Sequence, residues 1–207
     1  MSDEFQQRSA ELIAAGRTLY ERGMVPATSG NFSARLDDGS LAITASGAHK
    51  GRLGPADILR VDAEGRSLDA RRPSAETGLH VQLYRRFADA GAVLHPHSVH
   101  ATLLSRLQAA AGYAPLLLRD YELLKAFPGL DSHEHVVEVP VFPNIQDIAT
   151  LAQQVDDHMH QYEVPYGYLI AGHGFYTWGG TVDDALRHVE AFEFLFTCEM
   201  KLRSLKS

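Results

Sequence analysis

Two histidines in the segment Leu94-His95-Pro96-His97 have the spacing of a metal-binding pair. On extended backbone, side chains two residues apart point to the same face. Pro96 favours this geometry, because a proline restricts the residue before it to extended conformations. Paired imidazoles suit Zn²⁺, which binds histidine nitrogen at about 2.0–2.1 Å. The alternative is two unrelated polar histidines in a turn, and the spacing alone leaves both interpretations open.

His173 is the candidate for a third ligand, in the segment Ala171-Gly172-His173-Gly174-Phe175. The flanking glycines let the backbone approach another group closely. Taken alone, His173 is read as a loop histidine that is bonded to a carbonyl. Together with His95 and His97 it completes the three-histidine set of catalytic zinc sites, in which an open position takes water or substrate. We therefore expect one Zn²⁺ per subunit, although Fe²⁺, Mn²⁺ and Co²⁺ also fit such a set.

Other histidines are weaker candidates for metal ligation. His158 and His160 lie in an expected helix, where a two-residue step turns side chains about 200° apart, so they cannot share one ion. The segment His133-Glu134-His135 could chelate an ion, but polar turn residues surround it and we expect a solvated loop. The remaining histidines on expected helices are assigned to the core edge or the surface: His80, His100 and His188.

Three short segments rich in small and hydroxyl-bearing residues could form an anion site. Ser29-Gly30-Asn31 separates an expected helix from a strand, and Ser46-Gly47 follows the next strand, with Lys50 close behind. Backbone N–H groups and hydroxyls in such loops form concavities that suit phosphate. Ser74 and Glu76 open an expected helix, whose N-terminus also attracts anions. Each segment alone is more often an ordinary turn, but three of them in one half of the chain favour phosphate binding.

Glu122 and Lys125 lie three residues apart in a segment of weak helical character. Charged residues at this spacing are neighbours on a helix surface and stabilise it by about 0.2–0.5 kcal/mol. The pattern by itself therefore indicates a surface ion pair. A role for Glu122 in proton transfer comes only from the resemblance described below.

The hydrophobic pattern predicts the elements that position these residues. Apolar side chains recur at helical spacing over residues 4–22, 75–89, 99–107, 145–162 and from Thr181 onward, and weakly over 121–126. Short apolar runs bounded by turn residues predict strands over 32–36, 41–44, 58–61, 66–68, 92–94, 136–141, 168–171 and 173–178. Pro140 should break the strand over 136–141. Helices and strands mix without a strict βαβ repeat. We therefore expect one three-layer domain over residues 1–207, with a mostly antiparallel sheet covered by helices.

Composition excludes several classes of protein. The 207 residues are 45% hydrophobic and 22% charged, which is typical of a globular domain and not of a disordered or fibrous chain. A net charge of −7 argues against electrostatic binding of nucleic acid or of an anionic membrane. The single cysteine, Cys198, excludes an internal disulfide framework. An acidic start and the lack of a long apolar run lead us to expect a soluble, cytoplasmic protein.

Taken together, these segments resemble the class II aldolase/adducin family over nearly the whole chain. The blocks that carry the resemblance are Ser29–Asn31, Leu94–Thr102, Glu122–Phe127, Val139–Asp147 and Gly172–Gly179. Together they are specific, whereas a His-x-His pair alone is not. Within the family, they are similar to members that remove water from 5-methylthioribulose 1-phosphate in methionine salvage, forming 2,3-diketo-5-methylthiopentyl 1-phosphate.

The resemblance implies an α/β/α sandwich, a homotetramer with sites near subunit interfaces, and specific roles for individual residues. It implies that Glu122 is the catalytic acid/base, near the metal in the same subunit or across a subunit boundary, with a pKa raised by partial burial. Ala75 departs from the sugar-phosphate aldolases, which commonly carry a second serine there, and Glu76 matches their catalytic glutamate. The implied ligands are His95, His97 and His173, and the implied substrate contacts are Ser29, Gly30, Asn31, Ser46, Gly47, Ser74 and Glu76.

The implied dehydration is consistent with elementary chemistry. A Zn²⁺ ion held by neutral histidines keeps its charge and can polarise the C2 oxygen of a ketose. A carboxylate can then remove the C3 proton and return it to the departing C4 hydroxyl. The alternatives are an aldolase or epimerase that uses the same activated sugar, and a non-enzymatic scaffold of the adducin type. Retention of all three candidate ligands argues against the scaffold.

Overall fold

A seven-stranded, mostly antiparallel sheet forms the centre of the molecule in the computed structural model, which describes residues 3–206. The only parallel pair among its strands is β7–β8. Its strands are, in spatial order, β3 (Ile58–Val61), β2 (Leu41–Thr44), β1 (Asn31–Arg35), β4 (Ala92–His95), β9 (Gly174–Gly179), β8 (Gly167–Ile170) and β7 (Val141–Phe142).

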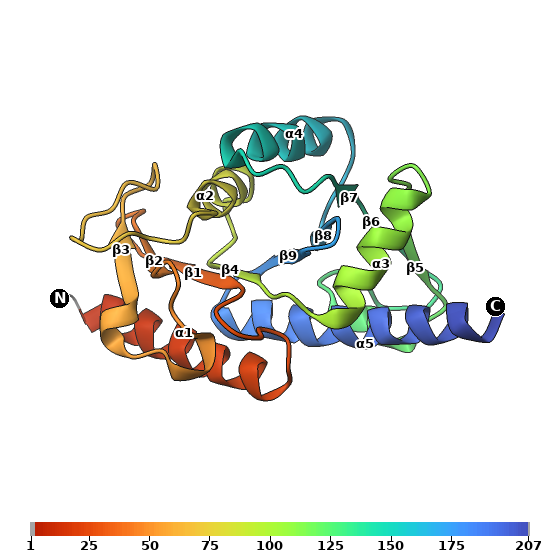
Figure 1. The fold of residues 1–207 in the computed structure, drawn as a ribbon, viewed down its shortest axis with the longest axis horizontal. Coiled ribbons are helices and arrows are strands. Elements are labelled where there is room, and N and C mark those ends of the chain that lie inside the picture. Colours follow the sequence, from red (N-terminus) through yellow and green to blue (C-terminus); the bar gives the residue numbers. More distant parts are fainter. Residues whose placement is uncertain (1–2, 207) are drawn as a thin grey trace.

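Helices cover both faces of this sheet, so the chain folds into three layers (Figure 1). On one face lie α1 (Asp3–Glu21), α3 (Val99–Ala110) and α5 (Val182–Lys206). On the other face, α2 (Thr77–Arg86) packs against α4 (Ile148–Gln161). The central strands β4 and β9 consist of buried residues throughout, because a sheet covered on both faces must be apolar on both.

Two hydrophobic cores fill the spaces between the layers. Neighbouring residues of β4 contribute to different cores, since successive side chains of a strand point to opposite faces. Leu94 packs in the core that includes Phe192 of α5, and Val93 packs in the core that includes Leu151 of α4. The sheet is thus held from both sides, which gives the loops at its edges a rigid base.

A second, two-stranded sheet lies beside the main one. It pairs β5 (Leu116–Arg119) with β6 (Val136–Val139) in antiparallel fashion. Between these strands the chain forms the short 3₁₀ helix η3 (Glu122–Ala126), which packs on α5. Pro140 separates β6 from β7, and the chain moves there from the small sheet to the large one. The Pro140 carbonyl accepts a hydrogen bond from the Leu169 N–H at 2.9 Å.

The structure confirms the predicted three-layer architecture and its mostly antiparallel sheet. One predicted strand was wrong, because residues 66–68 form only a single bridge, from Val61 to Ser67. The predicted break at Pro140 in the strand over 136–141 is confirmed, since β6 ends at Val139 and β7 begins at Val141. Strand β5 was not predicted, because its apolar run is short and alternates only weakly. None of the helices within residues 3–206 is long and apolar enough to cross a membrane.

Candidate metal and substrate site

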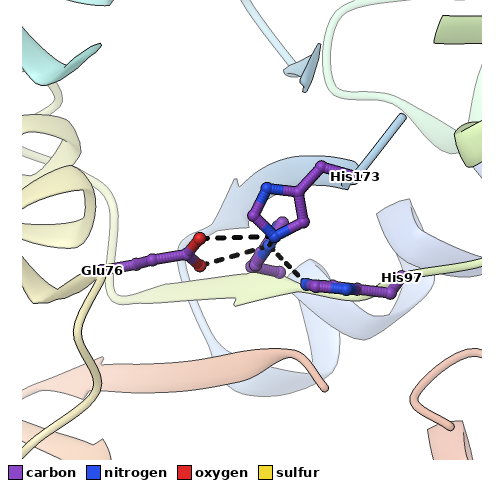
Figure 2. A group of neighbouring side chains, drawn as sticks. Glu76, His97 and His173 are labelled. Atoms are coloured by element: carbon purple, nitrogen blue, oxygen red, sulfur yellow. Dashed lines mark hydrogen bonds and ion pairs between the residues drawn. The ribbon is translucent and has the colours of Figure 1, made fainter. Parts of the chain in front are cut away.

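Three histidines and one glutamate point their side chains toward one another where the central strand β4 ends and β9 begins (Figure 2). Nε2 of His95 lies 2.9 Å from Nε2 of His97 and 3.4 Å from Nε2 of His173. The Glu76 carboxylate closes the group, with one oxygen 3.3 Å from His95 Nε2 and the other 3.3 Å from His173 Nε2. One ligand atom from each of the four residues lies within 4.8 Å of all the others.

The elements of the sheet bring these side chains together. His95 is the fully buried last residue of β4, His97 follows Pro96, and His173 lies in the turn between β8 and β9. Gly174 makes the close approach possible. A Cβ there would lie 2.3 Å from the Pro96 carbonyl oxygen, and 3.2 Å from Cδ2 of His97. Any larger residue at this position would push the two histidine segments apart.

The donor set fits a tetrahedral metal ion. Nδ1 of His95 donates to the Phe175 carbonyl at 2.8 Å, so that in the neutral ring Nε2 carries a lone pair. Such a bond from the outer nitrogen is typical of histidine ligands, because it fixes the ring orientation. Two nitrogens bound to one Zn²⁺ at about 2.0–2.1 Å would lie about 3.3 Å apart, close to the distances observed here.

Burial favours the neutral forms of His95 and His97, the form that binds metal ions. Loss of solvation lowers the pKa of His95 well below its usual value, and the neighbouring His173 lowers it further. Loss of solvation also lowers the pKa of His97 to about 2, with smaller contributions from His95 and His173. Neutral imidazoles present lone pairs to a cation, and the Glu76 carboxylate brings the only negative charge within this group of four.

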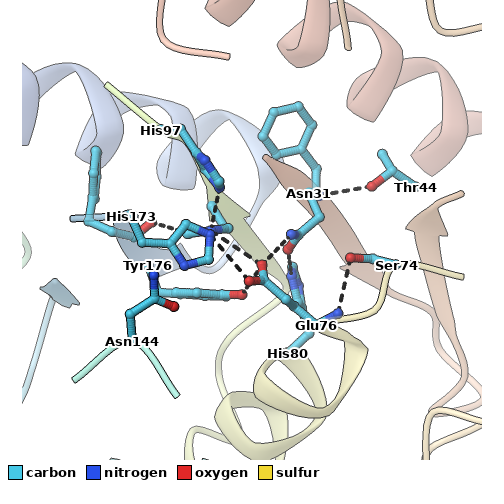
Figure 3. Close-up of polar contacts among 12 residues, drawn as sticks. Asn31, Thr44, Ser74, Glu76, His80, His97, Asn144, His173 and Tyr176 are labelled. Carbon is cyan, nitrogen blue, oxygen red and sulfur yellow. Dashed lines mark hydrogen bonds and ion pairs between the residues drawn. The ribbon is translucent and has the colours of Figure 1, made fainter. Parts of the chain in front are cut away.

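Glu76 is held by contacts from both sides. Asn31 donates from Nδ2 to Oε2 of Glu76 at 2.6 Å, and the Tyr176 hydroxyl donates to the same oxygen at 2.9 Å (Figure 3). The backbone N–H of Glu76 donates to the Ser74 hydroxyl at 3.3 Å, where helix α2 begins. The position of Glu76 therefore depends on β1, β9 and the start of α2 at once.

The three segments predicted to bind an anion lie next to one another. The Ser46 N–H donates to the Arg72 carbonyl at 3.0 Å, and the Ser74 N–H donates to the Thr44 carbonyl at 3.2 Å. The segment around Ser29 is joined to them by Lys50, which donates to the Thr28 carbonyl at 2.8 Å. The Ser29 hydroxyl is buried and has no hydrogen-bond partner. A buried polar atom without a partner is costly, and a bound anion would provide one.

Lys50 links two of these segments from inside the protein. Its ammonium group donates to the Thr28 carbonyl at 2.8 Å and to the Ala48 carbonyl at 2.7 Å, and the residue is only 2% exposed. Burial lowers its pKa to about 8, while the charge of Glu76 opposes the shift. The sequence showed a cation in this loop, but its burial and its tie to Thr28 depend on tertiary structure.

Glu122 lies apart from this group within the chain. It begins η3, its side chain is 73% exposed, and it pairs with Lys125 at 2.6 Å. The hydrogen bond from Lys125 lowers the pKa of Glu122, so the raised pKa expected from partial burial was wrong for the single chain. Leu124 of the same short helix packs in the core on the α5 face, whereas Glu76 begins α2 on the other.

The other histidines occupy different parts of the molecule. Their described hydrogen-bond partners lie outside the cluster: His100 bonds to Glu193 at 2.6 Å, His135 to Asp131 at 3.1 Å, and His188 to the Trp178 carbonyl at 2.7 Å. His80 is the exception, because it is fully buried and bonds to Asn31 beneath the site. The sequence contained one indication that His80 lies near the site. His80 follows Glu76, the N-cap residue of α2, by four residues, a spacing that places two residues on the same side of a helix.

Comparison with known proteins identifies relatives over almost the full length. Residues 10–200 match the family model described as "Class II Aldolase and Adducin N-terminal domain". A methylthioribulose-1-phosphate dehydratase from Methylococcus capsulatus is 59% identical over 203 residues, which cover 98% of each chain. One from Pseudomonas paraeruginosa is 55% identical over 206 residues, 99% of each chain.

A solved structure shares the fold at lower identity. YgbL from Klebsiella pneumoniae, described as a putative aldolase/epimerase/decarboxylase, aligns with a TM-score of 0.82 at 27% identity. The alignment covers 97% of this chain and 92% of that one. The three-layer arrangement is therefore shared by proteins whose described reactions differ, so the reaction must be argued from the site.

Proposed function

The chain belongs to the class II aldolase and adducin family, and on that premise we propose that it dehydrates 5-methylthioribulose 1-phosphate. The product is 2,3-diketo-5-methylthiopentyl 1-phosphate, and the reaction is a step of methionine salvage. The observation that carries the proposal is the convergence of three histidines and a glutamate beside loops suited to phosphate. The names of the curated relatives, which match over nearly the whole chain, support the same reaction.

The family and the cluster indicate a divalent metal ion, and we propose Zn²⁺ held by His95, His97 and His173. When bound, the ion supplies Lewis-acid stabilisation of the negative charge that develops on the sugar as C3 loses its proton. The chain's own part is to hold neutral nitrogen donors in a fixed orientation. His95 does so through its bond to the Phe175 carbonyl, which leaves Nε2 free.

The anion loops bind the C1 phosphate in this proposal. The contacts come from Ser29, Gly30, Asn31, Ser46, Gly47 and Ser74. The side chain of Asn31 already bonds to Glu76 and His80, so Asn31 contributes through its backbone and through the orientation of Glu76. Binding the phosphate fixes the sugar, so that one carboxyl group can serve both proton transfers.

We assign the proton transfers to Glu122, with Glu76 as a substrate-side group or alternative base. A carboxylate takes the C3 proton and then gives it to the C4 hydroxyl, which leaves as water when the C4–O bond breaks. The enol that remains becomes the diketone. Because Glu122 lies apart from the histidine cluster of its own chain, the assignment requires a neighbouring subunit. A homotetramer with sites near the interfaces is therefore part of the proposal, as are a single domain and a cytoplasmic location.

The test is the mass of the product. Purified protein loaded with Zn²⁺ is incubated with 5-methylthioribulose 1-phosphate, and the reaction mixture is analysed by mass spectrometry. Loss of one water from the substrate supports the proposal. Cleavage between C3 and C4 into two smaller fragments would instead show an aldolase, and an unchanged mass with an isomeric product would show an epimerase. Either result contradicts the dehydration.

A further inference from the structure

Four buried polar side chains form a continuous hydrogen-bonded series that begins at the Glu76 carboxylate, and only the first of them, Asn31, has a role in the proposed reaction. Figure 3 shows the part of the series formed by Asn31 and His80. Asn31 contacts Glu76 Oε2 at 2.6 Å, and Nε2 of His80 contacts the Asn31 side-chain oxygen. Nδ1 of His80 lies 2.7 Å from the Ser33 hydroxyl, which lies 2.9 Å from the Tyr84 hydroxyl. All four side chains are buried, and His80 and Ser33 are completely so.

Each hydrogen bond in this series can have only one direction. A carboxylate only accepts, so Asn31 turns its amide nitrogen to Glu76 and its oxygen to His80. That oxygen also only accepts, so Nε2 of His80 must carry the proton. In a neutral ring Nδ1 is then an acceptor and takes the Ser33 proton, and the Ser33 oxygen accepts in turn from Tyr84.

The ionisation states agree with this order. Burial lowers the pKa of His80 to about 4, against a smaller opposing effect of Glu76, so the ring is neutral at pH 7. Burial raises the pKa of the Tyr84 hydroxyl, which therefore keeps its proton and donates it to Ser33. Since all four side chains have hydrogen-bond partners, this hydrogen-bonded series is a rigid support for Glu76.

The support acts on one oxygen of Glu76. Oε2 receives hydrogen bonds from Asn31 and from the Tyr176 hydroxyl. His80 contacts both donors, because its ring also packs edge-on against Tyr176, with the centroids 5.6 Å apart. Among the described residues, no hydrogen bond to Oε1 of Glu76 is found, and this oxygen lies 3.3 Å from Nε2 of His173. Hydrogen bonds therefore fix Oε2, whereas Oε1 can accept a further partner.

We propose that His80 is a positioning residue, which as the Nε2–H tautomer orients the Asn31 amide toward Oε2 of Glu76 and leaves Oε1 free for the metal ion or a proton. The inference rests on the proposed function only in assigning Glu76 to the reactive site. Mutation of residues that hydrogen-bond to the groups around a metal ion typically changes metal affinity or activity by about 10–100-fold, although these residues touch neither metal nor substrate.

The first test is the tautomer of His80 in the unmodified protein. Nitrogen-15 NMR of the histidine rings at pH 7, assigned by comparison with the His80→Gln variant, distinguishes Nε2–H from Nδ1–H. We expect Nε2–H, and an Nδ1–H ring would overturn the proposal. This measurement needs neither substrate nor a functional variant, so it decides the role of His80 even if the proposed reaction proves wrong.

The second test uses Co²⁺ as a spectroscopic metal in variants of equal size. His80→Phe should weaken Co²⁺ binding by about 10-fold or more and alter its visible spectrum. His80→Gln, whose amide can donate from a similar position, should recover most of the affinity. The control is His188→Phe, which removes another buried histidine that bonds only to the Trp178 carbonyl in the described structure, and should leave the spectrum unchanged.

A double-mutant cycle separates positioning through Glu76 from a general effect on folding. In a Glu76→Gln background, His80→Phe should cause no further loss of Co²⁺ affinity, because the group it orients is already altered. In the unmodified background, His80→Phe should lower kcat about 10-fold while KM changes little. An equal loss of Co²⁺ affinity in both backgrounds, or an equal effect of His188→Phe, would overturn the proposal.

Discussion

The Nε2 atoms of His95 and His97 lie 2.9 Å apart, slightly closer than two nitrogen ligands of one tetrahedral ion. Two acceptor atoms at this distance are stabilised by a cation between them. We expect a chelator to remove activity and to lower the free energy of unfolding, by about 2.7 kcal/mol relative to protein in free Zn²⁺ at one hundred times its Kd. Denaturant unfolding with and without the chelator measures this difference.

Metal content provides the matching mutational prediction. His97→Ala and His173→Ala should each lose the ion, because each removes one of the three proposed nitrogen donors. Elemental analysis of the purified variants checks this. The control is His160→Ala, which alters an exposed histidine on α4 and should retain one ion per chain. Full metal content in either site variant would remove that histidine from the ligand set.

Substitution of Glu122 distinguishes a surface ion pair from a proton-transfer group. If Glu122 only pairs with Lys125, then Glu122→Gln should leave turnover unchanged. If it transfers the protons, turnover should fall by about 10²–10⁴-fold with metal content intact, and we expect this result. The matched control is Lys125→Gln, which breaks the same ion pair and leaves the carboxylate in place. A dead Glu76→Gln beside a normal Glu122→Gln would transfer the role to Glu76.

Mixed oligomers test whether Glu122 acts in a neighbouring subunit's site. His97→Ala removes a ligand and Glu122→Gln removes the acid/base, so each variant alone should be inactive. If the two residues come from different chains, subunits of both kinds unfolded and refolded together should regain activity. The refolded mixture is compared with each variant refolded alone. No regain of activity would mean that each site takes both residues from one chain.

The buried hydroxyl of Ser29 leads to a prediction in which binding and stability respond differently. Because this hydroxyl has no partner in the chain, Ser29→Ala should leave the free energy of unfolding unchanged or slightly raised. Loss of a hydrogen bond to a charged phosphate should raise KM by about 10-fold or more. The same substitution of a half-buried serine outside the three loops, Ser132→Ala, is the control for KM. A KM unchanged from the original protein would exclude Ser29 from the phosphate site.

The lowered pKa of Lys50 predicts a pH dependence of stability. Its pKa is about 8 in the folded chain and about 10.4 in an unfolded one. Between these values the unfolded chain binds more protons, so the free energy of unfolding rises with pH. Below pH 8 the lysine is charged in both states and adds no pH dependence. Lys50→Met should abolish this contribution.

The measurement for Lys50 is urea unfolding of the metal-free protein at several pH values from 7 to 10. The stability of the original chain minus that of Lys50→Met should increase across this range. Contributions from all other groups cancel in the difference as long as they are independent of Lys50. A constant difference would show that the folded and unfolded pKa values of Lys50 are the same.

Local pattern was enough to find the histidines of the site but not what supports them. His95 and His97 share a short extended segment, so their common direction follows from backbone geometry. The glycines beside His173 marked a close approach, which Gly174 makes. By contrast, His80 looked like any helical histidine, because the partners of a buried polar group are set by strands distant in sequence.

The same limit explains the errors in the fold. Regular elements with clear hydrophobic periodicity, such as α1 and α4, were predicted to within a few residues. The segment 66–68 follows a turn typical of a hairpin but forms only one bridge, from Ser67 to Val61. Strand pairing depends on residues distant in sequence, so a short apolar run does not by itself indicate which strand it will pair with.

The change of sheet at Pro140 has a consequence for how this architecture can diversify. Residues 116–139 form a small unit of two strands with η3 between them, and they contribute no residue to the four-residue histidine and glutamate cluster. Mutations in this unit therefore need not disturb that cluster. With Glu122 as the proposed acid or base, exchange of this unit between family members should exchange that group beside an unchanged cluster.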